Sequence, residues 1–408
     1  MRRTYTLLAT LLLLGCTAGS AGSPTLNASG VAAIDRMFQA AVDTGEIPGV
    51  VAAVMNKDQT LYLGAFGKQD VARGVPMSKD TLFRIASMTK PVTSVGIMML
   101  YEQGKLRLDD PVGDYLPAYK GRAVISAFDE KDATYTTRQA KSEMTIRHLL
   151  THTSGLSYPF TSPTVLAIQT KTGTDPKDLP LLFDPGTKWN YSQATALLGE
   201  IIEKLSGQSI EEWDQARLFR PLGMVDTSYM PAPEKVARLA TVHQWESTGL
   251  VETPNPPGYT PSVRGDGGLI STAADYSAFV QMFLNEGRWR GTQLLEPETI
   301  RLMTTNQMGS VVVDTMPAAM PRRSAPFPFG AGKDKFGLGF QITVTDGTST
   351  HERGAGSYTW GGINNTHFWV DPKNGVGVVI LTQVLPFYNA VSMDVLKRFE
   401  TLIYEHLQ

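Results

Sequence analysis

The sequence predicts an α+β protein with one central antiparallel sheet, helices at both ends of the chain and a mostly helical insertion in the middle. Two observations lead to this fold class. Candidate strands gather near both ends of the chain, each group with a helix outside it, whereas the segment between them carries apolar residues mainly at helical spacing. With 408 residues, 42% of them hydrophobic and 19% charged, the chain is able to bury a sizeable core.

The N-terminal part is expected to form one helix and one β-hairpin. Apolar residues recur at helical intervals over residues 26–42, and the Pro48-Gly49 pair ends that segment. Two short apolar segments, 49–54 and 61–65, flank turn-forming residues at 56–58. The helix therefore comes first, and the first two strands are expected to pair with each other.

The middle of the chain is expected to be mainly helical. Helix-like spacing of apolar residues occurs over residues 146–150, 194–205, 210–218 and 276–283. Two stretches rich in proline and glycine, 254–261 and 317–332, are predicted to be surface loops beside a pocket. We therefore expect an inserted helical part at about residues 106–281.

The C-terminal part is expected to complete the sheet. Strand candidates lie at residues 340–345, 366–370 and 376–382, turn residues occupy 372–375, and a closing helix covers about 391–407. Residues 25–408 are thus predicted to form a single domain, whose α/β part comprises about residues 25–105 and 282–408.

The first 24 residues predict export. Arg2 and Arg3 precede an apolar run over residues 7–14, which is too short to span a membrane and is typical of a secretory signal peptide. The single cysteine, Cys16, follows this run as in bacterial lipoprotein signals, and the alternative is a chance cysteine in a discarded peptide. We expect an exported periplasmic or cell-envelope protein, with a lipid anchor to the membrane if Cys16 is lipidated.

Charge and missing motifs exclude several classes of function. A formal net charge of -2 provides no basic field for phosphates, so nucleic acid is not an expected partner. The sequence contains neither a Gly-x-Ser-x-Gly elbow nor a glycine-rich phosphate loop, and one cysteine makes no metal cluster. We expect a small-molecule substrate and chemistry without a cofactor.

Ser87 and Lys90 form the sharpest local pattern, placed where a predicted strand at 82–85 gives way to an apolar helix at 88–102. Three residues apart on a helix means one face, so the lysine can stand beside the serine hydroxyl. Burial would keep the amine neutral enough to act as a base. Spacing alone leaves open that Ser87 caps the helix and Lys90 is solvated, but Pro91 and the apolar helix favour a partnered lysine.

The chain resembles the serine β-lactamase and penicillin-binding protein superfamily, especially its class C-like branch and the family VIII carboxylesterases. The likeness rests on five stretches in family order: FRIASMTK (83–90), HLLTHTSGL (148–156), PGTKWNYS (185–192), GGLIST (267–272) and WGG (360–362). The resemblance implies a fold like that of β-lactamases and transpeptidases. It also implies that Ser87 is the nucleophile, Lys90 its base and Tyr191 a second proton-transfer group. Gln193 replaces the family's usual asparagine, which puts its expected role in substrate binding in doubt.

Trp360, Gly361 and Gly362 stand where penicillin-recognising members carry Lys-Thr-Gly. A lysine there would bind a carboxylate, whereas tryptophan offers an apolar wall and one N–H, so this departure favours neutral ester substrates. By the same resemblance, the backbone N–H groups of Ser87 and Ile363 would form the oxyanion hole, and the glycines would let the substrate approach closely.

Four histidines are candidates for a metal site or for the substrate pocket. His148 and His152 are four apart, but they lack a His-Glu-x-x-His context and a third ligand, so we expect no metal and a structural role. His351 and His367 flank the Trp-Gly-Gly stretch, and hydrogen-bonded structural roles are expected for both.

The favoured function is hydrolysis of small carboxylic esters through an acyl-enzyme on Ser87. Alternatives within the same fold are a β-lactamase or D-alanyl-D-alanine peptidase, against which Trp360 argues, and an acyltransferase. A fourth alternative is a binding lipoprotein without turnover. The oligomeric state and the natural substrate are left open by the sequence.

Overall fold

The computed structural model describes residues 23–253, 261–347 and 352–408. Residues 1–22 of the predicted signal peptide and tether, with Cys16, lie outside the described residues, as do most of the 254–261 loop and His351. Expectations for these segments stay predictions. Within the described ranges, no helix is long and apolar enough to cross a membrane.

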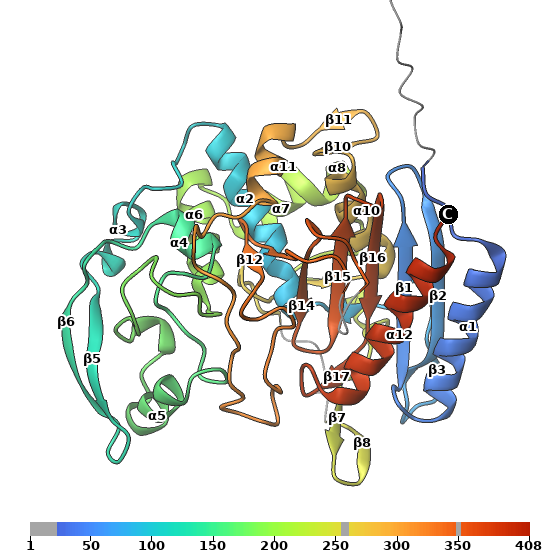
Figure 1. Cartoon of the computed structure of the whole chain (residues 1–408), viewed down its shortest axis with the longest axis horizontal. Helices are drawn as coiled ribbons and strands as arrows, with labels where there is room; N and C mark the ends of the chain where they lie inside the picture. Colours follow the sequence, from blue (N-terminus) through green and yellow to red (C-terminus); the bar gives the residue numbers. More distant parts are fainter. Residues whose placement is uncertain (1–22, 254–260, 348–351) are drawn as a thin grey trace, which may run out of the picture.

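Eight strands form the main sheet, and every neighbouring pair in it is antiparallel (Figure 1). Their order is β12-β13-β14-β15-β16-β1-β2-β3, so C-terminal and N-terminal strands meet where β16 pairs with β1. The strands are β1 (Gly49–Met55), β2 (Thr60–Asp70), β3 (Val75–Pro76), β12 (Lys335–Phe336), β13 (Gln341–Ile342), β14 (Tyr358–Gly362), β15 (Thr366–Asp371) and β16 (Val376–Leu381). The expected fold class is confirmed.

Both faces of this sheet are covered, because the side chains of its central strands alternate between two apolar clusters. In β1, Val50 and Val54 pack with the terminal helices, whereas Val51 and Met55 face the rest of the molecule. The terminal helices α1 (Ala28–Asp43) and α12 (Ala390–His406) lie together on one face, at the right of Figure 1. The rings of Phe38 and Phe399 join them, with centroids 4.9 Å apart.

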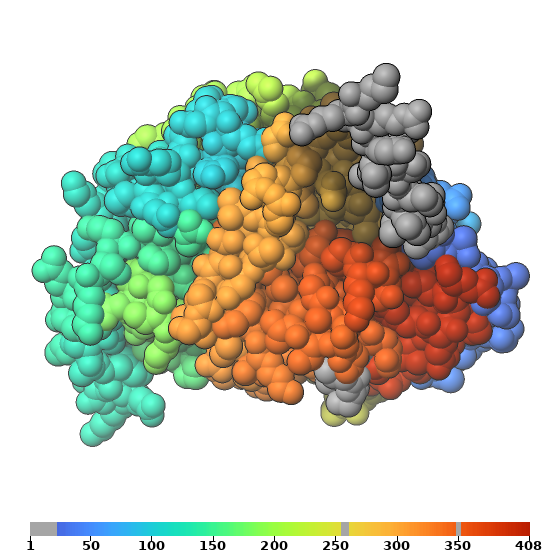
Figure 2. All heavy atoms as spheres, turned by 45° about the horizontal axis from the view of Figure 1, so that its top comes forward, coloured from blue at the N-terminus to red at the C-terminus, as the bar shows by residue number. Residues whose placement is uncertain are grey.

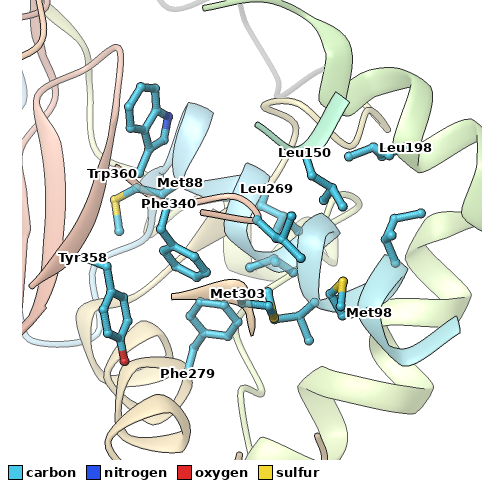
Figure 3. Packing of buried hydrophobic residues seen from close by; sticks show 14 of the residues in the cluster. Met88, Met98, Leu150, Leu198, Leu269, Phe279, Met303, Phe340, Tyr358 and Trp360 are labelled. Atoms are coloured by element: carbon cyan, nitrogen blue, oxygen red, sulfur yellow. The ribbon is translucent and has the colours of Figure 1, made fainter. Parts of the chain in front are cut away.

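The other face carries α10 (Ala273–Leu284), which packs against β1, β15 and β16. Beyond it lies α2 (Thr89–Glu102), whose residues from Thr89 to Leu100 are all buried. Figure 3 shows Met88 and Met98 packed among side chains from several elements, including Leu150, Leu198 and Phe340. The predicted boundary after residue 281 therefore falls inside a helix that packs on the sheet.

The remaining helices are short and lie mostly in the middle of the chain. They are α3 (Val112–Tyr115), α4 (Ile146–Leu150), α5 (Pro163–Thr172), α6 (Ala194–Ser206), α7 (Ile210–Asp214), α8 (Arg220–Leu222), α9 (Pro233–Val236) and α11 (Pro297–Met303). Three 3-10 turns, η1 (Ala86–Met88), η2 (Pro117–Tyr119) and η3 (Pro176–Asp178), and a π-helical turn, η4 (Gln215–Phe219), complete the set in the described ranges.

The middle of the chain also contains strands that the sequence did not predict. The hairpin β5 (Ala123–Asp129) and β6 (Thr134–Gln139) lies far from the main sheet, at the left edge of Figure 1. A second hairpin, β7 (His243–Glu246) and β8 (Gly249–Glu252), pairs in parallel with β17 (Val384–Leu385). The other short pairs are β4 (Phe83–Arg84) with β9 (Ile270–Ser271) and β10 (Arg288–Trp289) with β11 (Thr292–Gln293).

The two parts of the chain meet along a broad front. In Figure 2 the C-terminal residues, in red, lie against the N-terminal residues, in blue, while the green and cyan middle occupies the opposite end. Ser87 lies between the main sheet and the helical middle of the chain, because η1 contacts β14 and β15 while α2 packs against α6. Side chains from distant parts of the sequence can therefore reach it.

Candidate active site

Ser87 lies in the tight turn η1, between β4 and the buried helix α2. Ala86, directly before it, has a φ of 47°, a left-handed conformation that a residue with a Cβ rarely adopts. Backbone strain of this kind persists only where surrounding structure holds it, and it gathers at functional sites. The short strand β4 and this turn replace the predicted strand at 82–85 running directly into a helix.

Lys90, one turn further on, is buried and its amine meets three oxygens. Nζ lies 3.2 Å from Ser87 Oγ, 3.1 Å from Tyr158 Oη and 2.6 Å from the backbone carbonyl of Asp266. The solvated lysine that spacing alone left open is therefore not what the structure has. Lys90 is 1% exposed, and within the described ranges no carboxylate forms an ion pair with its amine.

Burial lowers the pKa of Lys90 to about 7, an effect that the nearby charge of Asp266 opposes and that of Arg264 reinforces. A lysine with that pKa is partly neutral near neutral pH, so its amine is able to accept a proton. Burial is therefore the physical reason why Lys90 is able to act as the base that the sequence predicts.

Tyr191 approaches the serine from the segment before α6. Its hydroxyl donates to Ser87 Oγ over 2.5 Å, and Lys90 Nζ lies 4.8 Å from the centre of its ring. Burial raises the pKa of Tyr191 above its ordinary value, which keeps the phenol protonated. Ser87, Lys90 and Tyr191, separated by up to 104 residues, are therefore brought together as predicted.

Three residues that the sequence reasoning missed surround Lys90. Tyr158 donates to a carboxylate oxygen of Asp266, and Arg264 pairs with the other oxygen at 2.9 Å. Burial raises the pKa of Tyr158 well above its ordinary value. Tyr158 lies two residues after the 148–156 stretch, and Asp266 stands directly before Gly267, so both flank stretches already singled out.

The end of β14 closes against the serine turn, and glycine makes this approach feasible. A Cβ on Gly362 would lie 2.2 Å from the carbonyl oxygen of Ile85. Glycine at this position leaves room for the carbonyl of Ile85. Close approach of the substrate to Gly361 and Gly362 stays a prediction. The turn bonds of η1 use the N–H groups of Met88 and Thr89, so they leave the N–H of Ser87 unused.

The cavity at Ser87 has a volume of about 170 Å³ and a largely aromatic wall. Its lining includes Phe160, Tyr191, Phe327, Trp360, Gly361, Ile363 and Phe387. The ring of Trp360 lies 5.0 Å from that of Tyr191, and its Nε1 has no hydrogen-bond partner among the described residues. Trp360 thus forms the apolar wall that the sequence predicted.

A larger hollow of about 830 Å³ adjoins this cavity, because both are lined by Tyr158, Phe160, Arg264, Asp266 and Arg323. Gln193, expected at the substrate, lines this hollow and not the cavity at the serine. Gln193 is the N-cap residue of α6, two residues after Tyr191, and its side chain lies in the lining of the larger hollow.

The family to which the chain belongs is shown by a comparison of its sequence with protein families. The beta-lactamase family model matches residues 34–400 of the chain. The chain belongs to the beta-lactamase family. Within this family, relatives include both esterases and acyltransferases.

Individual relatives cover nearly the whole chain. A lovastatin esterase from Penicillium rubens is 28% identical, over 91% of this chain and 98% of its own length. A monacolin J acid methylbutanoyltransferase from Aspergillus terreus is 29% identical, over 93% of this chain and 96% of its own length. The structure of the LovD6 mutant of simvastatin synthase LovD, also from Aspergillus terreus, matches with a TM-score of 0.79 at 28% identity, over 93% of this chain and 95% of that chain.

Three of the histidines considered from the sequence lie in the described residues, where none of them forms a hydrogen bond with Ser87. His148 Nδ1 accepts from the backbone of Thr145 at the start of α4. His152 is buried beside Tyr191, with ring centroids 4.9 Å apart, and burial lowers its pKa well below the ordinary value. His367 stacks on Phe387, and among the described residues its Nε2 has no hydrogen-bond partner. The hydrogen-bonded role expected for this residue stays a prediction. In the described part of the chain, no three His, Cys, Asp or Glu residues could together hold a metal ion.

Proposed function

We propose that this chain is a serine carboxylesterase that cleaves small carboxylic esters through an acyl-enzyme on Ser87. One observation carries the proposal: Ser87 Oγ lies within hydrogen-bond reach of both Lys90 Nζ and Tyr191 Oη, inside a cavity walled by aromatic rings. A nucleophile whose oxygen has a base at 3.2 Å and a second proton-transfer group at 2.5 Å forms the set that acyl transfer requires.

In the first step, neutral Lys90 accepts the proton of Ser87 while the serine oxygen attacks the ester carbonyl. The N–H groups of Ser87 and Ile363 would stabilise the negative oxygen that develops. When the carbon–oxygen bond to the alcohol breaks, Tyr191 donates its proton to the leaving oxygen. It then recovers a proton from the Lys90 ammonium, which returns the amine to its neutral form.

In the second step, water attacks the acyl-enzyme. Neutral Lys90 accepts a proton from the attacking water, the bond from carbon to Ser87 Oγ breaks, and the Lys90 ammonium returns a proton to the serine oxygen. The products are the free acid and the regenerated enzyme. Every proton released is taken up within the set, so the cycle is balanced.

Acyl transfer is a second candidate, and the hollow of about 830 Å³ beside the serine cavity favours it. A space of that size can hold an acceptor alcohol while the acyl group occupies the smaller cavity. The similarity to a methylbutanoyltransferase supports the same alternative. Water and alcohol would compete for one acyl-enzyme.

The deciding experiment compares purified mature protein with Ser87→Ala on p-nitrophenyl acetate, butyrate and octanoate, and on the chromogenic cephalosporin nitrocefin. We expect ester turnover that disappears in the variant, with little turnover of nitrocefin. Strong nitrocefin hydrolysis, or no activity that depends on Ser87, would overturn the proposal. A parallel assay with an added alcohol measures transfer directly, as the ratio of new ester to free acid.

A further inference from the structure

Arg323 lies beside the serine cavity, and its guanidinium forms no ion pair with the described residues. Its side chain lines both the cavity at Ser87 and the adjoining hollow. Among the described residues it has no hydrogen-bond or ion-pair partner, and burial is what lowers its pKa. Since a guanidinium keeps its proton at any physiological pH, the positive charge stands at the edge of the site without a counter-ion.

The backbone holds this residue in place. The N–H of Arg323 donates to the carbonyl of Met320 over 2.8 Å, and its carbonyl accepts from the N–H of Phe387 over 3.0 Å. Phe387 itself lines the serine cavity. The backbone is thus fixed on both sides of the Arg323 Cα. The guanidinium makes no hydrogen bond to the described residues, so its donors are able to bind a ligand.

The other charges at the serine cavity cancel. Arg264 pairs with Asp266 at 2.9 Å, and both belong to the lining. In the described lining of this cavity, Arg323 is therefore the one charge without an opposite partner. Arg323 is exposed at the edge of the cavity, and a cation without a counter-ion beside a cavity favours an anion at its side.

The adjoining hollow carries charges of both signs. Asp175, Glu200 and Glu203 line it together with Lys177, and burial together with the neighbouring acids raises the pKa of Glu200. The three acids disfavour an anion beside them, whereas Arg323 lines both the hollow and the serine cavity. In addition, Gln193 Nε2 is buried in the lining and has no hydrogen-bond partner among the described residues, so an oxygen of a ligand would satisfy it.

We propose that Arg323 binds a free carboxylate on the substrate, so that preferred substrates are esters carrying a carboxylate besides the ester group that reacts. This rests on the proposed esterase function and revises the expectation of neutral esters. The lysine that would bind a carboxylate from β14 is replaced by Trp360, and Arg323 supplies a cation from a different segment of the chain. A planar guanidinium suits a carboxylate through two parallel hydrogen bonds.

The test uses matched esters. On the acyl side, mono-p-nitrophenyl glutarate is compared with its methyl ester, and on the alcohol side 3-acetoxybenzoate is compared with methyl 3-acetoxybenzoate. In one of the two pairs, the carboxylate is expected to reach Arg323. For that pair, wild type should have a higher kcat/KM for the anionic ester than for the neutral one. In Arg323→Gln, kcat/KM for that member should fall about tenfold, as expected for one exposed charge-assisted contact, while the neutral member changes little.

Two further variants isolate the cause. Arg323→Lys should retain part of the preference, because the charge remains while the two-pronged geometry is lost. Arg322→Gln is the matched control: Arg322 pairs with Glu246 at 2.6 Å, away from the cavity lining, and its loss should leave both esters unchanged.

Equal loss on anionic and neutral esters in Arg323→Gln, or no loss on either, would overturn the inference. The same holds for a wild type that prefers the neutral member of both pairs. Failure of the esterase function is a separate result, because it appears as absent Ser87-dependent turnover of p-nitrophenyl acetate in every protein tested.

Discussion

Two buried cations, Lys90 and Arg353, lie in the same molecule in contrasting surroundings. Lys90 is 1% exposed and meets one hydroxyl from Ser87, another from Tyr158 and a backbone carbonyl. Arg353 is 8% exposed and forms a two-pronged pair with the carboxylate of Glu400, at 3.0 and 2.7 Å. Both are removed from water, yet Lys90 lies beside the hydroxyl of Ser87, whereas Arg353 is paired with a carboxylate of α12.

The partners decide what burial does to each charge. Burial lowers the pKa of Lys90 to about 7, because its partners are neutral oxygens and the carboxylate of Asp266 is shared with Tyr158 and Arg264. For Arg353, burial acts in the same direction, but the charge and hydrogen bonds of Glu400 outweigh it and raise the pKa. A buried cation with a carboxylate of its own serves structure, whereas one without it becomes able to exchange a proton.

The largest effect is expected from Lys90→Met. This change removes the amine while keeping an unbranched side chain of similar length, so the loss should be one of chemistry. We expect kcat/KM for p-nitrophenyl butyrate to fall by roughly 10²–10⁴-fold, the usual contribution of a general base. Circular dichroism serves as the control for folding. Near-normal turnover would assign the base to another group.

Arg353→Met should act on stability instead. Removing one partner leaves Glu400 buried without a counter-ion, which costs about 3–5 kcal/mol in the free energy of unfolding. Urea denaturation measures it, and Glu400→Gln offers a milder second variant if the first does not fold. The folded fraction should keep its specific activity. A loss of activity without a loss of stability would contradict the structural role given to this pair.

The two cations should also differ in how stability depends on pH. Between the lowered pKa of Lys90 near 7 and the ordinary lysine value, the unfolded chain binds a proton that the folded chain does not. Stability therefore rises with pH in this window, by at most about 1.4 kcal/mol per pH unit. Unfolding free energies of wild type and Lys90→Met should diverge accordingly as pH rises above about 7. A constant difference would mean that Lys90 keeps its ordinary pKa.

Asp266→Asn should produce the smallest effect, a shift of the pH profile. Wild-type kcat/KM should rise through about pH 7, as Lys90 becomes neutral. The charge of Asp266 raises the pKa of Lys90 and that of Arg264 lowers it, so removing the carboxylate moves this rise to lower pH. Asp184→Asn, which weakens the ion pair with Arg138, is the matched control and should leave the profile in place. A shift to higher pH would contradict the assignment.

The elements that could be predicted are those whose sequence pattern matches their burial. The short apolar segments of β1, β2, β15 and β16 and the amphipathic helices α1 and α12 follow directly from spacing and turn residues. The hairpin β5–β6 was missed because β6 is exposed along its whole length and carries no apolar alternation. Strand β13 covers only two of the six residues predicted for it, since β-pairing there ends at Ile342.

The site divides in the same way. Ser87 and Lys90 are neighbours on one turn, so spacing along the chain was enough to relate them. Tyr191 needed the family resemblance, because nothing local connects it with a serine 104 residues away. Tyr158, Asp266 and Arg323 carry no motif of their own, and each gains its chemical meaning from the neighbours that folding places beside it.

By itself, the sequence determined the α+β class, the order of the main elements and the serine–lysine pair, because these depend on periodicity and on contacts within one turn of helix. The tertiary structure alone decided which oxygens surround Lys90, where Gln193 lies and which arginine stands unpaired at the cavity. The reason is physical: the charge state of a buried group depends on burial and on partners from distant segments, and neither is written in local spacing.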